Sequence, residues 1–217
     1  MKIFHILKRG NQDTEFRGIL LKALSTIHAN KLEEKAIVYL ASGFFDEIVT
    51  PPRMPISTFP NQATTLNLKN ALSGMTIKLL GAYNGKKGLV GFGSSIKSNV
   101  SSISAFYKYR FHAKIFIIEI DNRPVLEIIG SSNMTVAAYE GVRYTKKGNQ
   151  LYSLNYECDL VLVDDAFAID IKPNENISRF SYSDKDNNGI TLQDRAEEIL
   201  RHIKSLEQEM IDVTSEL

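Results

Sequence analysis

The chain has 217 residues, of which 43% are hydrophobic and 24% charged, with a formal net charge of +1, the balance of a globular protein with one sizeable domain. No apolar run approaches the roughly 20 residues needed to span a bilayer, the N-terminus lacks the long apolar region of a signal peptide, and the single Cys158 excludes an internal disulfide and a thiol zinc cluster. We therefore expect a cytoplasmic protein without a membrane partner.

Helices and strands alternate in the first part of the chain. Residues 14–31 place apolar side chains three and four positions apart, which predicts an amphipathic helix. Residues 35–45 and 76–82 are rich in β-branched and other apolar residues and predict buried strands, with a helix at 64–74 between them. Strand, helix and strand at this spacing indicate a mixed or parallel sheet covered by helices.

The rest of the chain adds further strands and a long helix. Residues 83–99 are rich in Gly and Ser and contain no Walker pattern, so they predict a surface loop. Residues 191–213 carry an apolar stripe at helical spacing, which predicts a long C-terminal helix. Strand-like runs lie at 103–109, 112–120, 124–129 and 156–164.

Together these elements predict an α/β fold, with a mixed β-sheet flanked by helices on both faces. Residues 1–170 would form the main domain. Residues 171–217 would form a polar connection and a C-terminal helix that packs on this domain or on a dimer partner.

One apolar strand carries an unusual pair of side chains. Residues 110–119 are Arg-Phe-His-Ala-Lys-Ile-Phe-Ile-Ile-Glu, and because strand side chains alternate, His112 and Lys114 face the same way. If the strand is continuous from its start, Lys108 and Arg110 share that face. A buried cation is costly unless it meets an anion, and a bound phosphate would be such an anion.

Residues downstream can complete a site for a phosphodiester. The turn Gly-Ser-Ser-Asn-Met-Thr at 130–135 contains Asn133, and Glu157 lies on a later apolar strand. If these residues converge with His112 and Lys114, the lysine supplies charge, the asparagine amide donates to a non-bridging oxygen and the carboxylate orients the imidazole. No cluster of Asp, His or Cys has the spacing of a metal site, so we expect neither a metal nor another cofactor.

The pattern resembles that of the phospholipase D superfamily, in which His, any residue, Lys, four residues and Asp precede Gly-Ser-any-Asn. Glu119 stands where the family usually has Asp, and we expect a supporting, structural role for it. The gap from Glu119 to Gly130 is longer than usual, and a strand-turn-strand through 121–124 would absorb the extra residues. The residues that match the pattern are His112, Lys114, Gly130, Ser131 and Asn133.

Asn133 followed by Glu157 on an apolar strand, together with the early run 38–45, is similar to the nuclease branch of this superfamily, the metal-independent restriction endonucleases. The resemblance implies that residues 1–170 form a phospholipase D-like catalytic domain that hydrolyses DNA through a phosphohistidine on His112. It also implies a homodimer with the active site at the interface, in which His112 of the partner subunit protonates the leaving oxygen. The partner would be DNA or RNA, in a restriction or defence system. Three alternatives stay open for sequence recognition: it is absent, it is supplied by another polypeptide as a separate subunit, or its domain is cut away.

Charge is unevenly distributed along the chain. Residues 1–150 contain 20 Lys and Arg and 10 Asp and Glu, a balance of +10, whereas residues 151–217 contain 6 and 15, a balance of −9. Either the basic part presents a positive face to a polyanion, or both parts are ordinary surface and neutralise one another. The candidate substrate-binding residues are Lys86, Lys87, Lys97, Lys108 and Arg110.

Each candidate also has a structural interpretation. His112 would be a histidine satisfied within the core, and Glu157 would be the partner of a basic residue. Ser131, Ser132 and Asn133 would simply form a turn.

Two other functions stay open. A non-catalytic module that binds nucleic acid or serves as an assembly subunit would explain why Glu119 replaces Asp. A phosphatidyl transferase acting on lipid is disfavoured by the basic residues 1–150, by the lack of an apolar membrane-binding helix and by Glu157. Residues 202–209 repeat the His-x-Lys spacing within a helical segment, where residues two apart point in different directions, so the chain has one credible half-site.

Overall fold

The computed structural model describes residues 1–8, 15–43, 45, 68–83, 85–131, 142–144, 150–152, 157–167, 169–174, 176–180 and 189–217. The strands of the main sheet are β1 (Lys2–Lys8), β2 (Ala36–Ser42), β3 (Thr76–Gly81), β4 (Ser102–Tyr107), β5 (Lys114–Ile120), β6 (Arg123–Gly130), β9 (Glu157–Val163), β10 (Ile177–Phe180) and β11 (Ile211–Asp212). A separate hairpin contains β7 (Val142–Tyr144) and β8 (Gln150–Tyr152).

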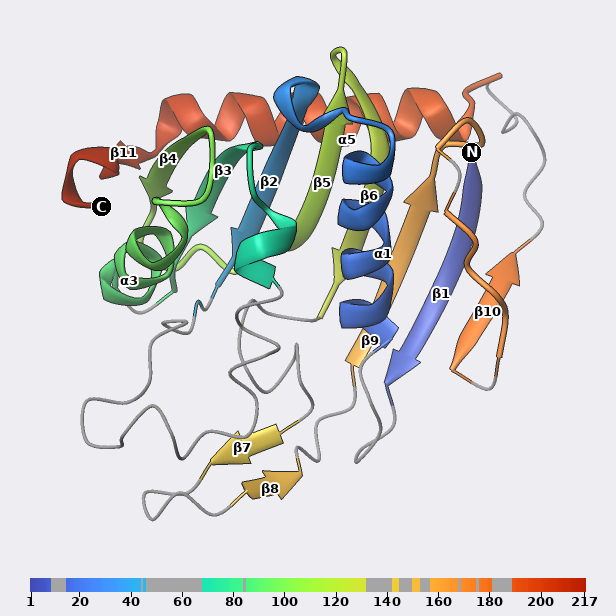
Figure 1. Cartoon of the computed structure of the whole chain (residues 1–217), viewed down its shortest axis with the longest axis horizontal. Helices are drawn as coiled ribbons and strands as arrows, with labels where there is room; N and C mark the ends of the chain where they lie inside the picture. The colour runs from blue at the N-terminus through green and yellow to red at the C-terminus, as the bar shows by residue number, and fades with distance from the viewer. Residues whose placement is uncertain are drawn as a thin grey trace.

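The main sheet is mixed and has the order β10-β1-β9-β6-β5-β2-β3-β4-β11 (Figure 1). β2, β3 and β4 run parallel to one another, and the remaining neighbours pair antiparallel. Helices α1 (Glu15–Ala29) and α3 (Lys87–Ile96) cover one face, and α5 (Leu192–Leu206) crosses the other (Figure 1). The predicted α/β fold with helices on both faces is therefore confirmed.

The larger part of the core lies between the sheet and α1 with α3. The stripe of α1 predicted from its spacing is buried there, and it consists of Phe16, Ile19, Leu20, Ala23, Leu24 and Ile27. On the opposite face, Leu200 and Ile203 of α5 pack against Tyr39, Leu80 and Ile117 of the sheet. Because α5 contacts the sheet of its own chain, the two faces of β2, β3 and β5 are both covered by helices.

The prediction of a loop at 83–99 is wrong, because most of this segment forms α3. Three apolar side chains of α3, spaced three and four apart, are buried in the core: Leu89, Phe92 and Ile96. Burying each of them stabilises the fold by about 1.5–3 kcal/mol. This gain outweighs the roughly 1 kcal/mol that each glycine costs within a helix. A Cβ atom at Gly93 would lie 2.6 Å from the Leu217 side chain and 3.1 Å from that of Leu79. The glycine therefore lets the end of the chain pack closely on α3.

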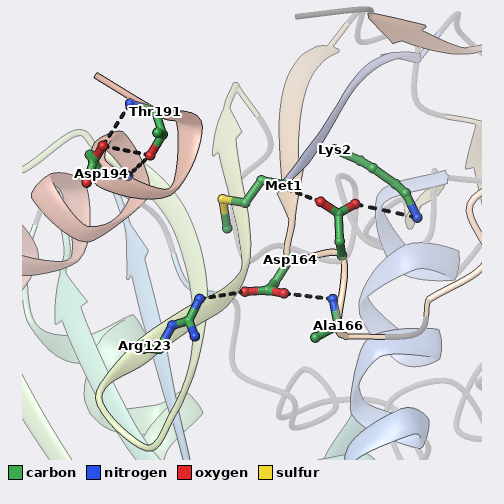
Figure 2. Close-up of polar contacts among 8 residues, drawn as sticks. Met1, Lys2, Arg123, Asp164, Ala166, Thr191 and Asp194 are labelled. Atoms are coloured by element: carbon green, nitrogen blue, oxygen red, sulfur yellow. Dashed lines mark hydrogen bonds and ion pairs between the residues drawn. The ribbon is translucent and has the colours of Figure 1, made fainter. Parts of the chain in front are cut away.

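The C-terminal helix is shorter than the predicted 191–213. α5 starts at a capping box, in which Thr191 and Asp194 exchange side-chain and backbone hydrogen bonds (Figure 2), and it ends at Leu206. The chain then forms β11, which pairs with β4 at Ile211 and Tyr107. Among the described helices, none has the combination of length and apolar character that crossing a membrane would require.

Long-range contacts fix two strands that the sequence analysis did not predict, β1 and β10. β1 lies between β9 and β10 and pairs antiparallel with both. The amino group of Met1 binds the Asp165 carboxylate at 2.8 Å, and Arg123 binds Asp164 at 3.3 Å just after β9 (Figure 2). The first pair holds the start of β1 beside the end of β9, and the second holds the start of β6 there.

The β5–β6 hairpin absorbs the residues that lengthen the family-like pattern, as predicted. Asp121 and Asn122 connect the strands with φ of 50° and 65°. Two consecutive positive φ angles in a two-residue connection are typical of a type I′ turn, which matches the twist of the strands.

Candidate active site

The candidate site lies where several strand ends meet, at the lower edge of the sheet in Figure 1. Gly81 at the end of β3 pairs with Ser42 at the end of β2, and Ser42 pairs with Lys114 at the start of β5. Gly130 at the end of β6 pairs with Asp159 near the start of β9. Residues from both ends of the motif are thereby brought to one edge.

His112 and Lys114 are in direct contact at this edge. Lys114 Nζ lies 2.9 Å from His112 Nε2, 3.2 Å from its Nδ1 and 3.2 Å from its carbonyl oxygen. An ammonium only donates, so an unprotonated ring nitrogen is its acceptor. His112 is exposed and Lys114 is half-buried, so an incoming anion can reach both groups.

The strand is not continuous through residue 108, which corrects the expectation that Lys108 and Arg110 share the face of His112. β4 ends at Tyr107, and a turn follows in which the Phe111 N–H donates to the Lys108 carbonyl at 3.2 Å. Arg110 lies in that turn with φ of 62°. His112 itself belongs to the connection that precedes β5.

Close packing positions the imidazole. The Tyr83 ring meets the His112 ring edge-on, with centroids 5.2 Å apart and an interplanar angle of 61°. A Cβ atom at Gly43 would lie 2.8 Å from His112 Cδ2, so a side chain there would displace the ring. Neither Gly43 nor Tyr83 belongs to the motif, so the sequence alone did not indicate a role for them.

The backbone at this edge is strained. Ala82, directly after β3, has φ of 82°, and Arg110 has φ of 62°. Such angles cost about 1–3 kcal/mol for non-glycine residues and are concentrated at functional sites. The Ala82 N–H donates to the Ser42 carbonyl at 3.0 Å and the Tyr83 N–H to the Gly43 carbonyl at 2.6 Å, which ties the end of β3 to the end of β2.

The start of the Gly-Ser turn is bound to β9. The Ser131 N–H donates to Asp159 Oδ1 at 3.0 Å and to the Cys158 carbonyl at 3.1 Å, while the Cys158 N–H donates to Ser131 Oγ at 2.8 Å. A Cβ atom at Gly130 would lie 2.2 Å from Asp159 Oδ1, so only glycine allows this approach. Ser131 is thus fixed to the start of β9 by both its backbone and its side chain.

The structure adds a carboxylate that the sequence analysis missed. Asp159 is buried and lines a small hollow together with Lys114, Phe16, Ala41 and Ile128. The alternation in Glu157-Cys158-Asp159 could have indicated it, because Asp159 and Glu157 are two apart on one strand and share a face. A cation and a carboxylate therefore border the same hollow.

Some predicted site residues fall outside the described part of the chain. Ser132 and Asn133 are in this group. Glu157 begins β9, where its backbone pairs with that of Lys8, and its side chain is also outside the described part.

Glu119 lies far from His112, near the opposite end of β5. Its buried carboxylate accepts a hydrogen bond from the Tyr39 hydroxyl at 2.8 Å and pairs with Lys204 Nζ of α5 at 2.7 Å. Burial and the bond to Glu119 raise the pKa of Tyr39. Glu119 thus joins the sheet to α5.

Three of the candidate phosphate-binding lysines contact the acidic C-terminal segment. Lys86 pairs with Glu216 at 2.6 Å, Lys108 pairs with Glu209 at 2.9 Å, and Lys97 donates to the Leu217 carbonyl at 3.1 Å. Lys108 lowers the pKa of the Glu209 carboxyl by its hydrogen bond and its charge. Exposed pairs of this kind contribute about 0–1 kcal/mol, so they leave the lysines able to exchange a carboxylate for a phosphate.

No group of three or more His, Cys, Asp or Glu side chains suited to a metal ion occurs in the described part of the chain. No protein-family model and no curated protein match the sequence.

Solved structures with distant similarity include the archaeal chromatin protein TrmBL2 (8% identity, 97% of this chain and 53% of that chain, TM-score 0.35). Others are yeast tyrosyl-DNA phosphodiesterase (13%, 72% and 31%, TM-score 0.30) and polyphosphate kinase from Porphyromonas gingivalis (14%, 94% and 28%, TM-score 0.37). The chain thus spans only about a quarter to a half of the length of these proteins. Identities and TM-scores this low do not assign a family.

Proposed function

We propose that this chain is a metal-independent phosphodiesterase that hydrolyses nucleic acid, with His112 as nucleophile. The observation that carries the proposal is the direct contact of an exposed imidazole with a lysine ammonium at a sheet edge. The spacing of the two residues resembles the phospholipase D pattern, and the Gly-Ser turn of the same pattern adjoins the edge through Gly130 and Ser131.

The proposed reaction has two steps. An unprotonated nitrogen of His112 attacks phosphorus, a P–N bond forms and the P–O bond to the leaving nucleoside oxygen breaks. The protonated His112 of the partner subunit gives its proton to that oxygen. Water then attacks the phosphohistidine, the P–N bond breaks and the partner's His112 accepts the proton of the water.

The other residues act on the phosphate and on the imidazole. Lys114 would place its positive charge against the non-bridging oxygens, where negative charge develops, and Asn133 would donate to one of them. Glu157 would orient the imidazole. Asp159 would orient Lys114, because both border one hollow. The proposed substrate is DNA or RNA, in a restriction or defence system with a separate recognition subunit.

A homodimer follows from the number of half-sites. The reaction needs one neutral and one protonated imidazole, and the chain has one His-x-Lys pair at a strand. A two-fold axis at the site would supply the second pair.

The test is hydrolysis of plasmid and of single-stranded DNA in excess chelator. We expect cleavage of at least one of the two substrates by the natural chain, loss of it in His112→Ala, and no change in His202→Ala. His202 is a matched control, because it has the same spacing to a lysine but is exposed on α5. Cleavage that requires magnesium, or that survives in His112→Ala, would overturn the mechanism.

Mixing tests the dimer. Wild-type and His112→Ala subunits that are unfolded and refolded together should form heterodimers with little activity, because one of the two roles is empty. A fully active monomer would exclude the two-histidine arrangement.

A further inference from the structure

Exposed aromatic side chains flank the candidate site. In the described part of the chain, the large aromatic residues that stand out as exposed are Tyr83 (37%), Tyr109 (63%) and Phe180 (48%). Tyr83 contacts the His112 ring, and Tyr109 is three residues before His112. Phe180 lies on β10, at the other end of the sheet order. Exposed aromatic surface is therefore concentrated near His112.

The backbone holds Tyr109 in a defined place. Its turn is closed by the hydrogen bond from the Phe111 N–H to the Lys108 carbonyl, and the Arg110 N–H donates to the Tyr83 carbonyl at 3.2 Å. The second bond links the Tyr109 turn to the residue that packs on His112. Three residues of chain span at most about 11 Å, so Tyr109 lies within reach of a nucleotide next to one bound at His112.

The surroundings of Tyr109 are cationic. The Arg110 guanidinium carbon lies 5.4 Å from the centre of the Tyr109 ring, an arrangement of cation and π face. Lys108 and Arg110 flank the ring in sequence and are exposed. Lys108 pairs with Glu209 and Arg110 lies at the ring. An exposed ring beside exposed cations is the combination that binds single-stranded nucleic acid, since bases stack on the ring and phosphates meet the cations.

We propose that Tyr109 is a stacking platform for an unpaired base, so that the site takes single-stranded nucleic acid or a frayed end rather than continuous duplex. Within a duplex both faces of a base are covered by its neighbours, so only an unpaired base can stack on the ring. The inference rests on the proposed function for the position of the phosphate, at His112. To that function it adds single-stranded nucleic acid as the class of substrate.

Equilibrium binding tests the platform without needing cleavage. The probes are a short fluorescein-labelled single strand with one 2-aminopurine and the matching duplex, each titrated with His112→Asn protein to prevent hydrolysis. Tyr109→Ala should weaken single-strand binding by about 5- to 150-fold, the range for loss of one stacked base, and should abolish 2-aminopurine quenching. Tyr109→Phe should bind as the parent does, because stacking needs the ring and not the hydroxyl.

Phe180→Ala is the matched control and should leave both affinities unchanged. Duplex binding should be insensitive to Tyr109→Ala, and the salt dependence of single-strand binding should keep its slope, because no phosphate contact is lost. Unchanged single-strand affinity in Tyr109→Ala, or an equal loss for duplex, would overturn the platform. Stacking without any hydrolysis by the natural chain would overturn the proposed reaction and leave the platform standing.

Discussion

Among the residues that the structure describes, Glu127 is a buried carboxyl group with no hydrogen-bond partner, and its removal should change how stability depends on pH. Glu127 lies on β6 between Ile117 of β5 and Leu162 of β9, on the face that α5 covers, and both of its carboxylate oxygens lack a hydrogen bond. Lys204 of α5, a cation on this face, is bound to Glu119. Burial raises the pKa of Glu127 from 4.5 to about 8.

The direction in which stability changes with pH follows from proton binding to Glu127. Between pH 4.5 and 8 the folded protein holds a proton on Glu127 that the unfolded chain has released. The free energy of unfolding is therefore highest, as far as Glu127 is concerned, below pH 4.5, and it falls as the pH rises towards 8. Each pH unit is worth about 1.4 kcal/mol, so the loss between pH 4.5 and 7 is about 3 kcal/mol. Glu127→Met has no such group and should lack this loss.

The assay is urea unfolding of the natural chain and of Glu127→Met at several pH values from 4.5 to 8.5, followed by circular dichroism. The difference in unfolding free energy between the two should grow by about 3 kcal/mol from pH 4.5 to 7, whatever methionine does to packing. Parallel pH curves would refute the assignment of a neutral Glu127. Glu119→Met is the matched control on the neighbouring strand, and it should instead destabilise by about 1–3 kcal/mol, because Tyr39 and Lys204 lose their acceptor.

Three further substitutions test the site and its frame. Gly43→Ala should reduce hydrolysis strongly with little change in thermal stability, because its Cβ atom would displace the exposed His112 ring, and histidine NMR shifts would show the displacement. Asp159→Asn should keep the fold, since the amide oxygen can still accept from Ser131, but should lower kcat, and equal activity would mean that the carboxylate only anchors the turn. Asn122→Gly should raise the melting temperature slightly, by relief of a left-handed residue worth about 1 kcal/mol or less, and a lower melting temperature would contradict the turn assignment.

Periodicity along the chain was enough to predict most of the fold. The helix at α1 and the strands β2 to β6 and β9 follow from spacings of three to four and of two, because these patterns reflect which side of an element meets the core. The proximity of His112 and Lys114 was predicted for a similar local reason. Their contact forms although His112 precedes β5, since two residues along an extended chain remain neighbours.

Other elements depended on partners distant in sequence. α3 forms in a Gly-rich segment because the core and Leu217 cover it, and β1 forms because β9 and β10 pair with it. The acceptors for Lys86 and Lys108 come from the last residues of the chain, more than 100 positions away. No local pattern encodes such contacts.

The two glutamates of the β5–β6 hairpin show most directly what a local sequence pattern leaves undetermined. Glu119 stands between two isoleucines and Glu127 between leucine and isoleucine, so the local sequence treats them alike. The apolar runs around them predict strands at 112–120 and 124–129. Tertiary packing made the difference: Tyr39 of the neighbouring β2 and Lys204 of α5 meet Glu119, whereas no donor from the described part of the chain reaches Glu127, because these donors come from elements remote in sequence.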